Sequence, residues 1–418
     1  MSNIPKIRFK GFTDAWEQRK LGETCSRVQG NDGRMELPTL TISAANGWMK
    51  QEDRFSGNIA GKEQKNYTLL HKGELSYNHG NSKLAKYGTV FSLQTYEEAL
   101  VPRVYHSFKV ESGSADFIEY YFATKMPDRE LRKLISSGAR MDGLLNIGYD
   151  DFMGIKMMFP STLEQDKIAE YFRALDHLIT LHQRKCDNMK KIKKFMLQKM
   201  FPKKGEKFPE IRFEGFTDAW EQRKFGELAE YKKGPFGSAI TKSMFVPKSD
   251  DSVKVYEQQN AINNDWSLER YFLPKEYAYT RLKAFEVHSG DIIVSCAGTI
   301  GEIYEIPDNA EYGVINQALM RVRVNEKIVD KRMFIIAFSN MINEFTRTHS
   351  NGSAIKNIPP FADLKPMKVL MPSMEEQRVI SEYFEKIDHL ITLHQRKSDE
   401  LKEMKKYMLQ NMFPDGRK

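Results

Sequence analysis

The sequence has few cysteines and no long apolar run. Its 418 residues include only Cys25, Cys186 and Cys296, an odd and widely spaced set that provides neither a disulfide framework nor a CxxC metal pair. No window approaches the roughly 20 uncharged apolar residues that span a bilayer, so a membrane role is not expected. The first residues, MSNIPKIRFKGFTDAW, lack the apolar core of a signal peptide. The expected location is therefore the cytoplasm.

Catalytic motifs are also missing. GNIAGKE at 57–63 has three residues instead of four between its glycines and no Ser or Thr after the lysine, so it fails as a phosphate-binding loop. NIPPF at 357–361 differs from the NPPF-type motif of adenine-N6 methyltransferases because Ile358 separates the asparagine from the prolines. PDRE at 127–130 lacks nuclease spacing, and no HExxH, GxSxG or zinc cluster occurs. We expect a chain that is not an enzyme and that binds no cofactor or metal itself.

The positive charge is concentrated in one segment. Residues 182–207 contain ten Lys or Arg against Asp187 and Glu206, a local excess of +8 that equals the net charge of the whole chain. A basic chain can indicate nucleic-acid binding. A solvated face of one helix explains the same excess equally well, so charge alone does not establish DNA binding.

The dominant feature is an internal duplication. Residues 4–23, IPKIRFKGFTDAWEQRKLGE, match residues 208–227, FPEIRFEGFTDAWEQRKFGE, at sixteen of twenty positions with an offset of 204. A second block, 164–203, matches 376–415 with an offset of 212, and DHLITLHQRK is identical in both copies. The segments between these blocks, 24–163 and 228–375, share little beyond KMMFPSTLEQ and KVLMPSMEEQ at their ends. The repeated blocks form two similar frames around two dissimilar inserts, which indicates one shared support that carries two different specificities. The alternative is that the sequences of the inserts merely diverged after the duplication.

The second repeated block has the pattern of a coiled-coil helix. Apolar residues alternate in steps of four and three, interrupted at His182/His394, Cys186/Ser398 and Lys193/Lys405. Each helix of about 36 residues is about 54 Å long and needs a partner, so we predict that the two pair in antiparallel orientation. The predicted seam consists of Ile168, Phe172, Leu175, Ile179 and His182 in the first helix and Ile380, Phe384, Ile387, Ile391 and His394 in the second.

A flanking line widens each seam. It runs through Leu178, Leu181, Lys185, Met189 and Ile192, and through Leu390, Leu393, Lys397, Leu401 and Met404 in the second copy. This line either contacts another protein or packs against the chain's own inserts. The two histidines on the seam lack a second ligand at metal spacing, so we interpret them as packing residues. Trp16 and Trp220 are interpreted as core anchors, and Asp14 with Glu17, like Asp218 with Glu221, fits a helix-capping pair.

Each insert alternates short β-rich runs with turns, as in KYGTVFSL and HSGDIIVSCAG. We predict a compact α+β domain for each. Loops rich in Asn, Gln, Ser, Lys and Arg can bond base edges and phosphates. The candidates are Asn46, Asn78, His79, Asn81, Ser82, Lys83, Lys86 and Arg140 in the first insert and Ser238, Lys242, Gln258, Gln259, Asn260, Gln317, Ser353 and Lys356 in the second. The loops are predicted more firmly than the individual side chains, because any one of them can be an ordinary surface residue.

These parts together resemble a known family. Two variable domains that alternate with two repeated helices, the GFTDAWEQRKLGE leader, the P-x-x-x-EQ-x-x-I start of each helix (Pro160 to Ile168 and Pro372 to Ile380) and GPFGS at 234–238 resemble the specificity subunit of type I restriction-modification enzymes. The implied fold is α+β, with a pseudo-twofold repeat and an antiparallel coiled coil. The implied domains are 1–163 (leader and first target-recognition domain), 164–203 (first helix), 204–375 (linker, second leader and second target-recognition domain) and 376–418 (second helix).

The resemblance also implies a function and partners. Each target-recognition domain would read one half of a bipartite site in double-stranded DNA, while the helices set the spacing and dock two methyltransferase subunits. Those subunits would bring S-adenosylmethionine, and a restriction and translocase subunit would bring ATP and Mg. The alternatives are a self-sufficient nuclease or methyltransferase, which the failed motifs disfavour, and a coiled-coil DNA-binding adaptor or interaction protein outside a restriction system.

Overall fold

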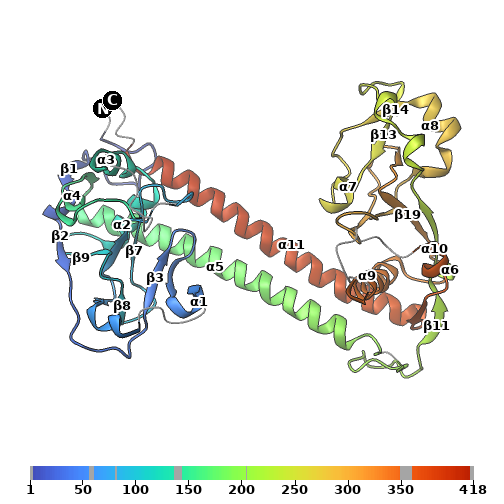
Figure 1. Ribbon diagram of the computed structural model, residues 1–418, viewed down its shortest axis with the longest axis horizontal. Coiled ribbons are helices and arrows are strands. Elements are labelled where there is room, and N and C mark those ends of the chain that lie inside the picture. Colours follow the sequence, from blue (N-terminus) through green and yellow to red (C-terminus); the bar gives the residue numbers. More distant parts are fainter. Residues whose placement is uncertain are drawn as a thin grey trace. The chain divides into compact units, whose positions relative to one another are not determined.

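The computed structural model describes residues 3–55, 61–80, 82–135, 144–203, 205–348 and 360–414 (Figure 1). Four predicted DNA contacts, Asn81, Arg140, Ser353 and Lys356, lie outside these ranges. The chain divides into two compact units. Unit 1 contains Met1–Cys186 and Thr392–Lys418, and unit 2 contains Asp187–Ile391. Each unit thus takes one leader, one insert, the start of one repeated helix and the end of the other.

Unit 1 is a mixture of short strands and helices. Its strands are β1 (Glu17–Lys20), β2 (Cys25–Val28), β3 (Leu40–Ser43), β4 (Gly47–Lys50), β5 (Thr68–His71), β6 (Leu75–Asn78), β7 (Thr89–Ser92), β8 (Glu98–Val101), β9 (His106–Val110) and β10 (Lys156–Phe159). Its helices are α1 (Gln51–Phe55), α2 (Ala115–Ala123), α3 (Asp128–Leu134), α4 (Tyr149–Met153) and the start of α5 (Thr162–Lys199).

Unit 2 repeats this composition. Its strands are β11 (Glu221–Lys224), β12 (Ala229–Lys233), β13 (Ser252–Tyr256), β14 (Phe272–Pro274), β15 (Glu286–Val287), β16 (Ile292–Ser295), β17 (Ile303–Glu305), β18 (Gly313–Ile315), β19 (Leu319–Val324) and β20 (Lys368–Met371). Its helices are α6 (Phe225–Leu228), α7 (Gln258–Ile262), α8 (Lys275–Arg281), α9 (Lys331–Thr348), α10 (Phe361–Leu364) and the start of α11 (Met374–Asn411).

The two inserts share a scaffold that their sequences do not reveal. Unit 1 contains an antiparallel sheet in the order β2-β9-β6-β7, and unit 2 contains one in the corresponding order β12-β19-β16-β17. In each unit a capped helix follows the strand of this sheet that comes last along the chain, β9 in unit 1 and β19 in unit 2. The Ser114 hydroxyl accepts from the Phe117 amide at the start of α2, and the Asp330 carboxylate accepts from the Met333 amide at the start of α9. The same scaffold therefore carries both inserts.

The inserts also share a second group of strands. In unit 1 the antiparallel pairs β3-β4 and β5-β8 are joined by a parallel bridge between Thr39 and Leu100, which gives the order β4-β3-β8-β5. Unit 2 has the corresponding four-stranded sheet in the order β14-β13-β18-β15, in which β13 and β18 are parallel. Parallel neighbours need a long connection, and residues 257–312 supply it in unit 2. The eight additional residues of the second insert therefore leave the order of these strands unchanged.

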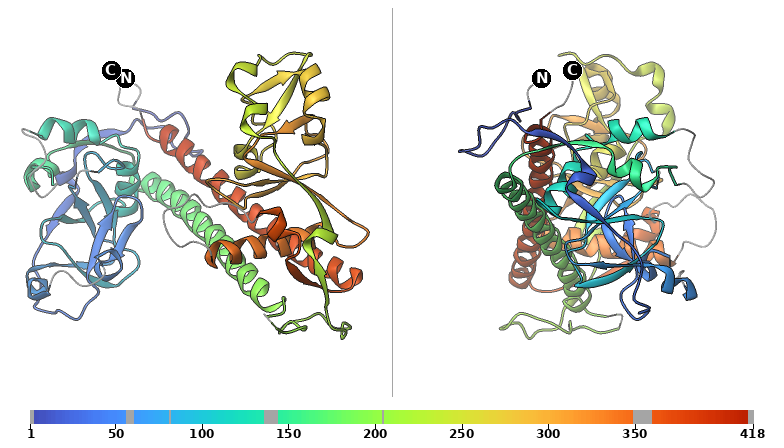
Figure 2. Two further views of the ribbon diagram at one scale, coloured as in Figure 1. Left: turned by 45° about the vertical axis from the view of Figure 1, so that its right-hand side comes forward. Right: turned by 90° about the vertical axis from the view of Figure 1, so that its left-hand side faces the viewer.

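The repeated helices pack in antiparallel orientation, as predicted. Within unit 1 the contacts run in opposite directions along the two helices, because Asp176 meets Lys405 and His182 meets His394. Figures 1 and 2 show α5 and α11 side by side. In the described ranges no helix is sufficiently long and apolar to cross a membrane. The predicted α+β class with an antiparallel coiled coil is confirmed.

Candidate functional site

The leader of each half is tied to its helix by a buried ion pair. Arg8 donates from Nε and Nη2 to the two carboxylate oxygens of Glu164, at 2.7 Å each. Arg212 does the same with Glu376, at 2.8 and 2.7 Å. These hydrogen bonds to the glutamates raise the pKa of both arginines. Two parallel bonds fix the direction of the guanidinium as well as its distance, so each pair sets where the leader meets the helix.

The glutamine after each glutamate joins three elements. The Gln165 amide donates to the Pro160 carbonyl at 3.0 Å and accepts from the Ser114 amide at 3.1 Å. Gln377 donates to the Pro372 carbonyl at 2.9 Å and accepts from the Asp330 amide at 2.8 Å. Both glutamines are buried. The repeated P-x-x-x-EQ motif is thus a joint between the leader, the capped helix of the insert and the long helix.

The tryptophan of each leader is buried, as predicted for a core anchor. The Trp16 ring makes edge contacts with Phe117 and Phe413, and the Trp220 ring makes one with Phe201. The helix-capping prediction for the neighbouring acidic residues is wrong. Glu17 begins strand β1, which pairs with β10, and Glu221 begins β11, which pairs with β20. The strand that leads into each long helix offers backbone partners, and this pairing overrides the local capping pattern.

The predicted seam is buried where it meets the inserts. Ile168, Phe172 and Leu175 lie in the core of unit 1, with Ile179 packed against it, and Ile380, Phe384 and Ile387 lie in the core of unit 2, with Ile391 packed against it. The C-terminal part of the opposite helix and the residues just after it enter each core, through Leu401 and Met412 in unit 1 and through Met200 in unit 2. The two lysine interruptions also have partners. Lys405 bonds Asp176 at 2.6 and 2.7 Å, and Lys193 bonds Asp388 at 2.5 Å.

The central histidine of each helix seam contacts the equivalent histidine of the other helix. The Nδ1 atoms of His182 and His394 are 3.1 Å apart and the ring centroids 5.2 Å apart. This contact needs one nitrogen with a proton and one with a free lone pair, so it cannot persist when both rings are cations. Desolvation, followed by the nearby His182 and Lys185, lowers the pKa of His394. The structural interpretation of these histidines therefore stands, with a dependence on pH.

We expect the helix pair to lose stability as the pH falls through the normal titration range of histidine. A lowered pKa means that the folded chain binds this proton less readily than the unfolded chain, so stability is complete at neutral pH and decreases on acidification. Thermal unfolding measured from pH 7.5 to pH 5 should show this decrease. His182→Gln with His394→Gln should flatten the profile. His177→Gln with His389→Gln, which alters the exposed histidines of the same helices, should leave the slope unchanged; equal slopes in all three proteins would contradict the role of the pair.

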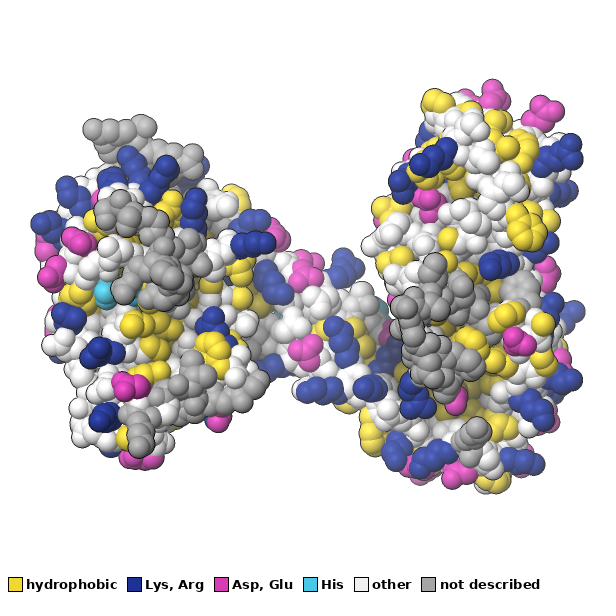
Figure 3. Space-filling model, viewed as in Figure 1, with side chains coloured by type: hydrophobic (Ala, Val, Ile, Leu, Met, Phe, Trp, Pro, Cys, Tyr) yellow, Lys and Arg dark blue, Asp and Glu magenta, His cyan; other side chains and the backbone are white. Residues whose placement is uncertain are grey.

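The identical decapeptide also presents the same exposed surface twice. Six of its ten positions are exposed in each copy. They include Leu178 and Leu181 and their equivalents Leu390 and Leu393, whose exposed fractions range from 37 to 49%. We call this surface the docking stripe, and it consists of Leu178, Leu181, Arg184 and Lys185 on α5 and Leu390, Leu393, Arg396 and Lys397 on α11. Figure 3 shows Lys and Arg side chains over much of the visible helix surface.

Outside the decapeptide some exposed helix positions differ between the copies, whereas others, such as Glu170/Glu382 and Lys194/Lys406, are identical. Ala174 corresponds to Lys386, Asn188 to Glu400 and Lys191 to Glu403. The flanking line predicted from the sequence is only partly exposed, because one of its members, Leu401, is buried in the core of unit 1. Packing within the described residues does not explain identity at the exposed positions of the docking stripe.

The structure sorts the predicted DNA contacts into three groups. Exposed positions are Asn46, Ser82, Lys83, Lys86, Ser238, Lys242, Gln259 and Gln317. Two amides are half-buried and bonded to the backbone: Asn78 donates to the Ile42 carbonyl at 3.2 Å, and Gln258 donates to the Ala297 carbonyl. His79 and Asn260 are buried.

The two buried candidates are corrections to the sequence prediction. Both ring nitrogens of His79 lie within hydrogen-bond distance of carbonyl oxygens, at 2.7 Å from Leu145 and 2.8 Å from Val104. Asn260 accepts from the Glu257 amide and donates to the carbonyls of Asp265 and Leu268. Their polar atoms are therefore used inside the fold and are unavailable to a base. Polar type alone does not distinguish a buried bonding role from a surface contact.

In the second insert, several candidate loops meet. The Gly234 amide donates to the Leu319 carbonyl at 2.8 Å, and the Cys296 amide donates to the Ala318 carbonyl at 2.8 Å. Gln258 bonds Ala297 in the same region. These bonds connect the loops that carry Ser238, Gln317 and Gln259. The sequence did not single out Phe236 in this cluster, although its position between Pro235 and Gly237 in the GPFGS motif is a signal for an exposed turn.

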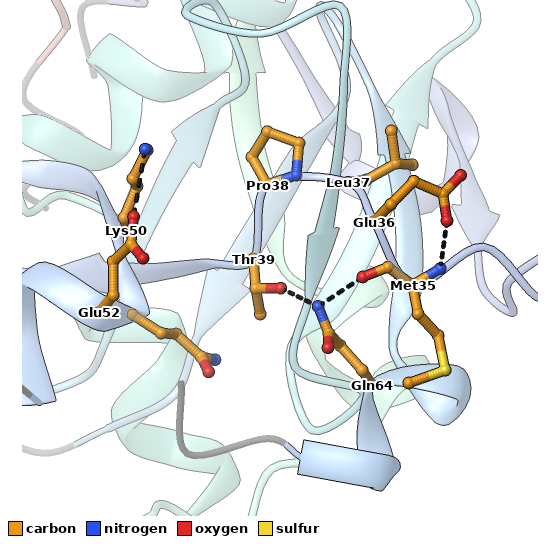
Figure 4. Close-up of a pocket in the computed structure, with 9 residues that line it drawn as sticks. Met35, Glu36, Leu37, Pro38, Thr39, Lys50, Glu52 and Gln64 are labelled. Carbon is orange, nitrogen blue, oxygen red and sulfur yellow. Dashed lines mark hydrogen bonds and ion pairs between the residues drawn. The ribbon is translucent and has the colours of Figure 1, made fainter. Parts of the chain in front are cut away.

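The first insert contains a polar cavity that the sequence did not predict. It has a volume of about 370 Å³, and none of the predicted DNA contacts lines it. Its lining consists of Met35, Glu36, Leu37, Pro38, Thr39, Lys50, Gln51, Glu52 and Gln64 (Figure 4). The Gln64 amide donates to the Met35 carbonyl at 3.0 Å and to the Thr39 hydroxyl. Among the described residues no three His, Cys, Asp or Glu side chains form a metal-ligand group.

Comparisons with known proteins agree with this architecture. Residues 217–403 match the family model of the type I restriction modification DNA specificity domain. Two relatives come from Methanocaldococcus jannaschii. The putative type I restriction enzyme MjaX specificity subunit is 23% identical over 266 residues, which cover 63% of this chain and 59% of that protein. The type I restriction enzyme MjaVIII specificity subunit is 23% identical over 314 residues, which cover 72% and 70%.

A solved structure shows the same fold. The crystal structure of the type I restriction-modification S subunit from M. genitalium matches with a TM-score of 0.61 at 13% identity, and the match covers 99% of this chain and 100% of that one. The fold and the family match define a protein with a type I DNA specificity domain. The resemblance to the specificity subunits of type I restriction-modification systems, which the sequence indicated, is confirmed.

Proposed function

We propose that each insert reads one half of a bipartite site in double-stranded DNA. The observation that carries this proposal is the pair of β2-β9-β6-β7 and β12-β19-β16-β17 scaffolds, which share strand order although the sequences of the two inserts share little. A shared scaffold that carries dissimilar side chains suits two domains with one role and two sequence preferences. Exposed polar and cationic side chains such as Lys86, Lys242 and Gln317 supply donors and acceptors for phosphates and base edges.

We further propose that the docking stripe binds two copies of one partner, the methyltransferase subunit. The identical exposed residues on α5 and α11 support two equivalent contacts. Leu178 and Leu181, with their equivalents, offer an apolar centre, and the adjacent Arg and Lys residues offer a basic rim. Protein interfaces commonly have an apolar centre and a polar rim. The helix pair also sets the spacing between the half-sites.

This chain then contributes recognition without catalysis. In the proposed complex the methyltransferase subunits bring S-adenosylmethionine for adenine methylation, and a restriction and translocase subunit brings ATP and Mg. The chain's own residues bind DNA and hold the partners, and it binds no cofactor or metal itself.

An exchange of inserts tests the proposal. Residues 24–163 are replaced by the corresponding insert of another specificity subunit, and the methylated motif is mapped in cells that contain the matching methyltransferase. One half of the motif should change while the other half and the spacing remain. The reciprocal exchange of 228–375 should change only the other half. A change in both halves, or in neither, would show that the inserts do not act as separate half-site readers, as expected for an adaptor outside a restriction system.

A further inference from the structure

Phe236 has the highest exposed fraction of the large apolar side chains in the described residues, 89%. A single exposed apolar residue is common on protein surfaces and needs no explanation by itself. Phe236 differs because its backbone is fixed and its neighbours are predicted DNA contacts. A rigidly held aromatic side chain loses little conformational freedom on binding, which favours its use as an anchor.

The loop around Phe236 is held on both sides. Before it, the Gly234 amide donates to the Leu319 carbonyl, and a Cβ at position 234 would lie 1.8 Å from the Asn316 carbonyl oxygen. Only glycine allows this approach. Pro235 is buried. After it, the Ala239 amide donates to the Phe236 carbonyl at 2.8 Å, and the Ala239 carbonyl accepts from the Tyr277 hydroxyl at 2.9 Å.

The surroundings suit a DNA groove better than a protein core. Lys233, Ser238 and Lys242, close in sequence to Phe236, are exposed. Gln317 is also exposed, on the loop against which Gly234 packs. Lysines can contact phosphates, and glutamine pairs with the N6 and N7 atoms of adenine in the major groove. Phenylalanine makes apolar contact with the C5-methyl group of thymine in the same groove.

We propose that Phe236 contacts the methyl group of a thymine in the half-site that unit 2 reads, and that it thereby selects an A·T pair at one position. This inference rests on the proposed function of the second insert as a half-site reader. It adds the residue, the groove and the chemical group that are recognised.

The test combines a protein change with a DNA change. The full chain, assembled with its methyltransferase subunits, is titrated with duplexes that contain the mapped motif. Each thymine of the half-site assigned to unit 2 is replaced in turn by uracil, which lacks only the methyl group. At one position this replacement should weaken binding about fourfold, the value of one buried carbon group. Phe236→Ala should weaken binding about tenfold or more, and the uracil replacement should then have no further effect at that position.

Three controls make the result specific. Tyr279→Ala removes another exposed ring from unit 2 and should leave affinity unchanged. Phe236→Leu, which keeps an apolar side chain, should retain most of the affinity. Replacement of thymine by uracil in the half-site of unit 1 should reduce the affinity by the same factor in the wild type and in Phe236→Ala. Unchanged affinity in Phe236→Ala, or a uracil penalty that persists in it at every position, overturns the inference. A wild-type complex that prefers no split site would instead contradict the proposed function.

Discussion

Glu376→Gln is expected to lower the stability of unit 2 by about 3 kcal/mol. The substitution removes the charge that pairs with Arg212 while nearly keeping the side-chain volume, and loss of one partner of a buried pair typically costs about 3–5 kcal/mol. The Glu376 side chain is almost completely buried, and it also accepts a 3.4 Å contact from the Trp220 indole. The Arg212 guanidinium would then lack a charged partner, and the second leader and the start of α11 would both become less stable.

Hydrogen exchange read by peptide can measure this effect separately in the two units. Peptides of the second leader and of β20 should exchange faster in Glu376→Gln, with little change in the first leader. Glu164→Gln is the matched control, because it breaks the equivalent pair with Arg8 and should produce the reverse pattern. Equal acceleration in both units by either variant would show that the two frames do not act independently.

Leu178→Glu combined with Leu390→Glu is expected to abolish assembly with the methyltransferase subunits. Both leucines lie on the docking stripe, and each substitution places a carboxylate in the proposed apolar centre. A residue at such a centre commonly contributes at least about 2 kcal/mol, which corresponds to about 30-fold in affinity for each partner copy. Sedimentation of the mixed subunits should then show free components, and methylation in cells should be lost.

The single variants distinguish two copies of the partner from one. Leu178→Glu alone, or Leu390→Glu alone, should leave a complex with one bound methyltransferase. Asn188→Glu is the matched control, since Glu400 occupies the equivalent position on α11, and it should assemble normally. Thermal unfolding should be similar in all of these proteins because the substituted positions are exposed. Full assembly of the double variant would exclude the docking stripe as the partner surface.

The parts of the fold that depend on periodic apolar patterns were predictable. The alternating steps of four and three from Ile168 and from Ile380 predicted both long helices and their seam, because a helix must bury such a stripe wherever it finds a partner. The antiparallel direction of the pairing was also predicted, because this direction lets one chain place its two inserts at opposite ends of the helix pair. The leader was less predictable, since Asp14 and Glu17 fit a helix cap locally, whereas pairing between β1 and β10 depends on a strand more than 130 residues away.

The individual side chains of the candidate site were the least predictable. His79 and Asn260 have the same polar character as Lys83 or Gln317, yet the fold uses their polar atoms internally. The proposed role of Phe236 as a fixed contact residue depends on the packing of Gly234 against the 316–319 loop, which lies about 80 residues further along the chain. Composition reports what a side chain can bond, while only the surrounding backbone determines whether that bond is already made.

The sequence by itself determined the duplication, the helix seam and the family resemblance, because these follow from local patterns and from direct comparison of one half with the other. Tertiary structure alone decided that two dissimilar inserts share one four-stranded scaffold, since strand order is set by pairing between distant segments. It also decided that the identical decapeptide meets its own copy at His182 and His394. Antiparallel packing of two repeats brings equivalent residues together at one point, and the same packing leaves the leucines of the docking stripe exposed.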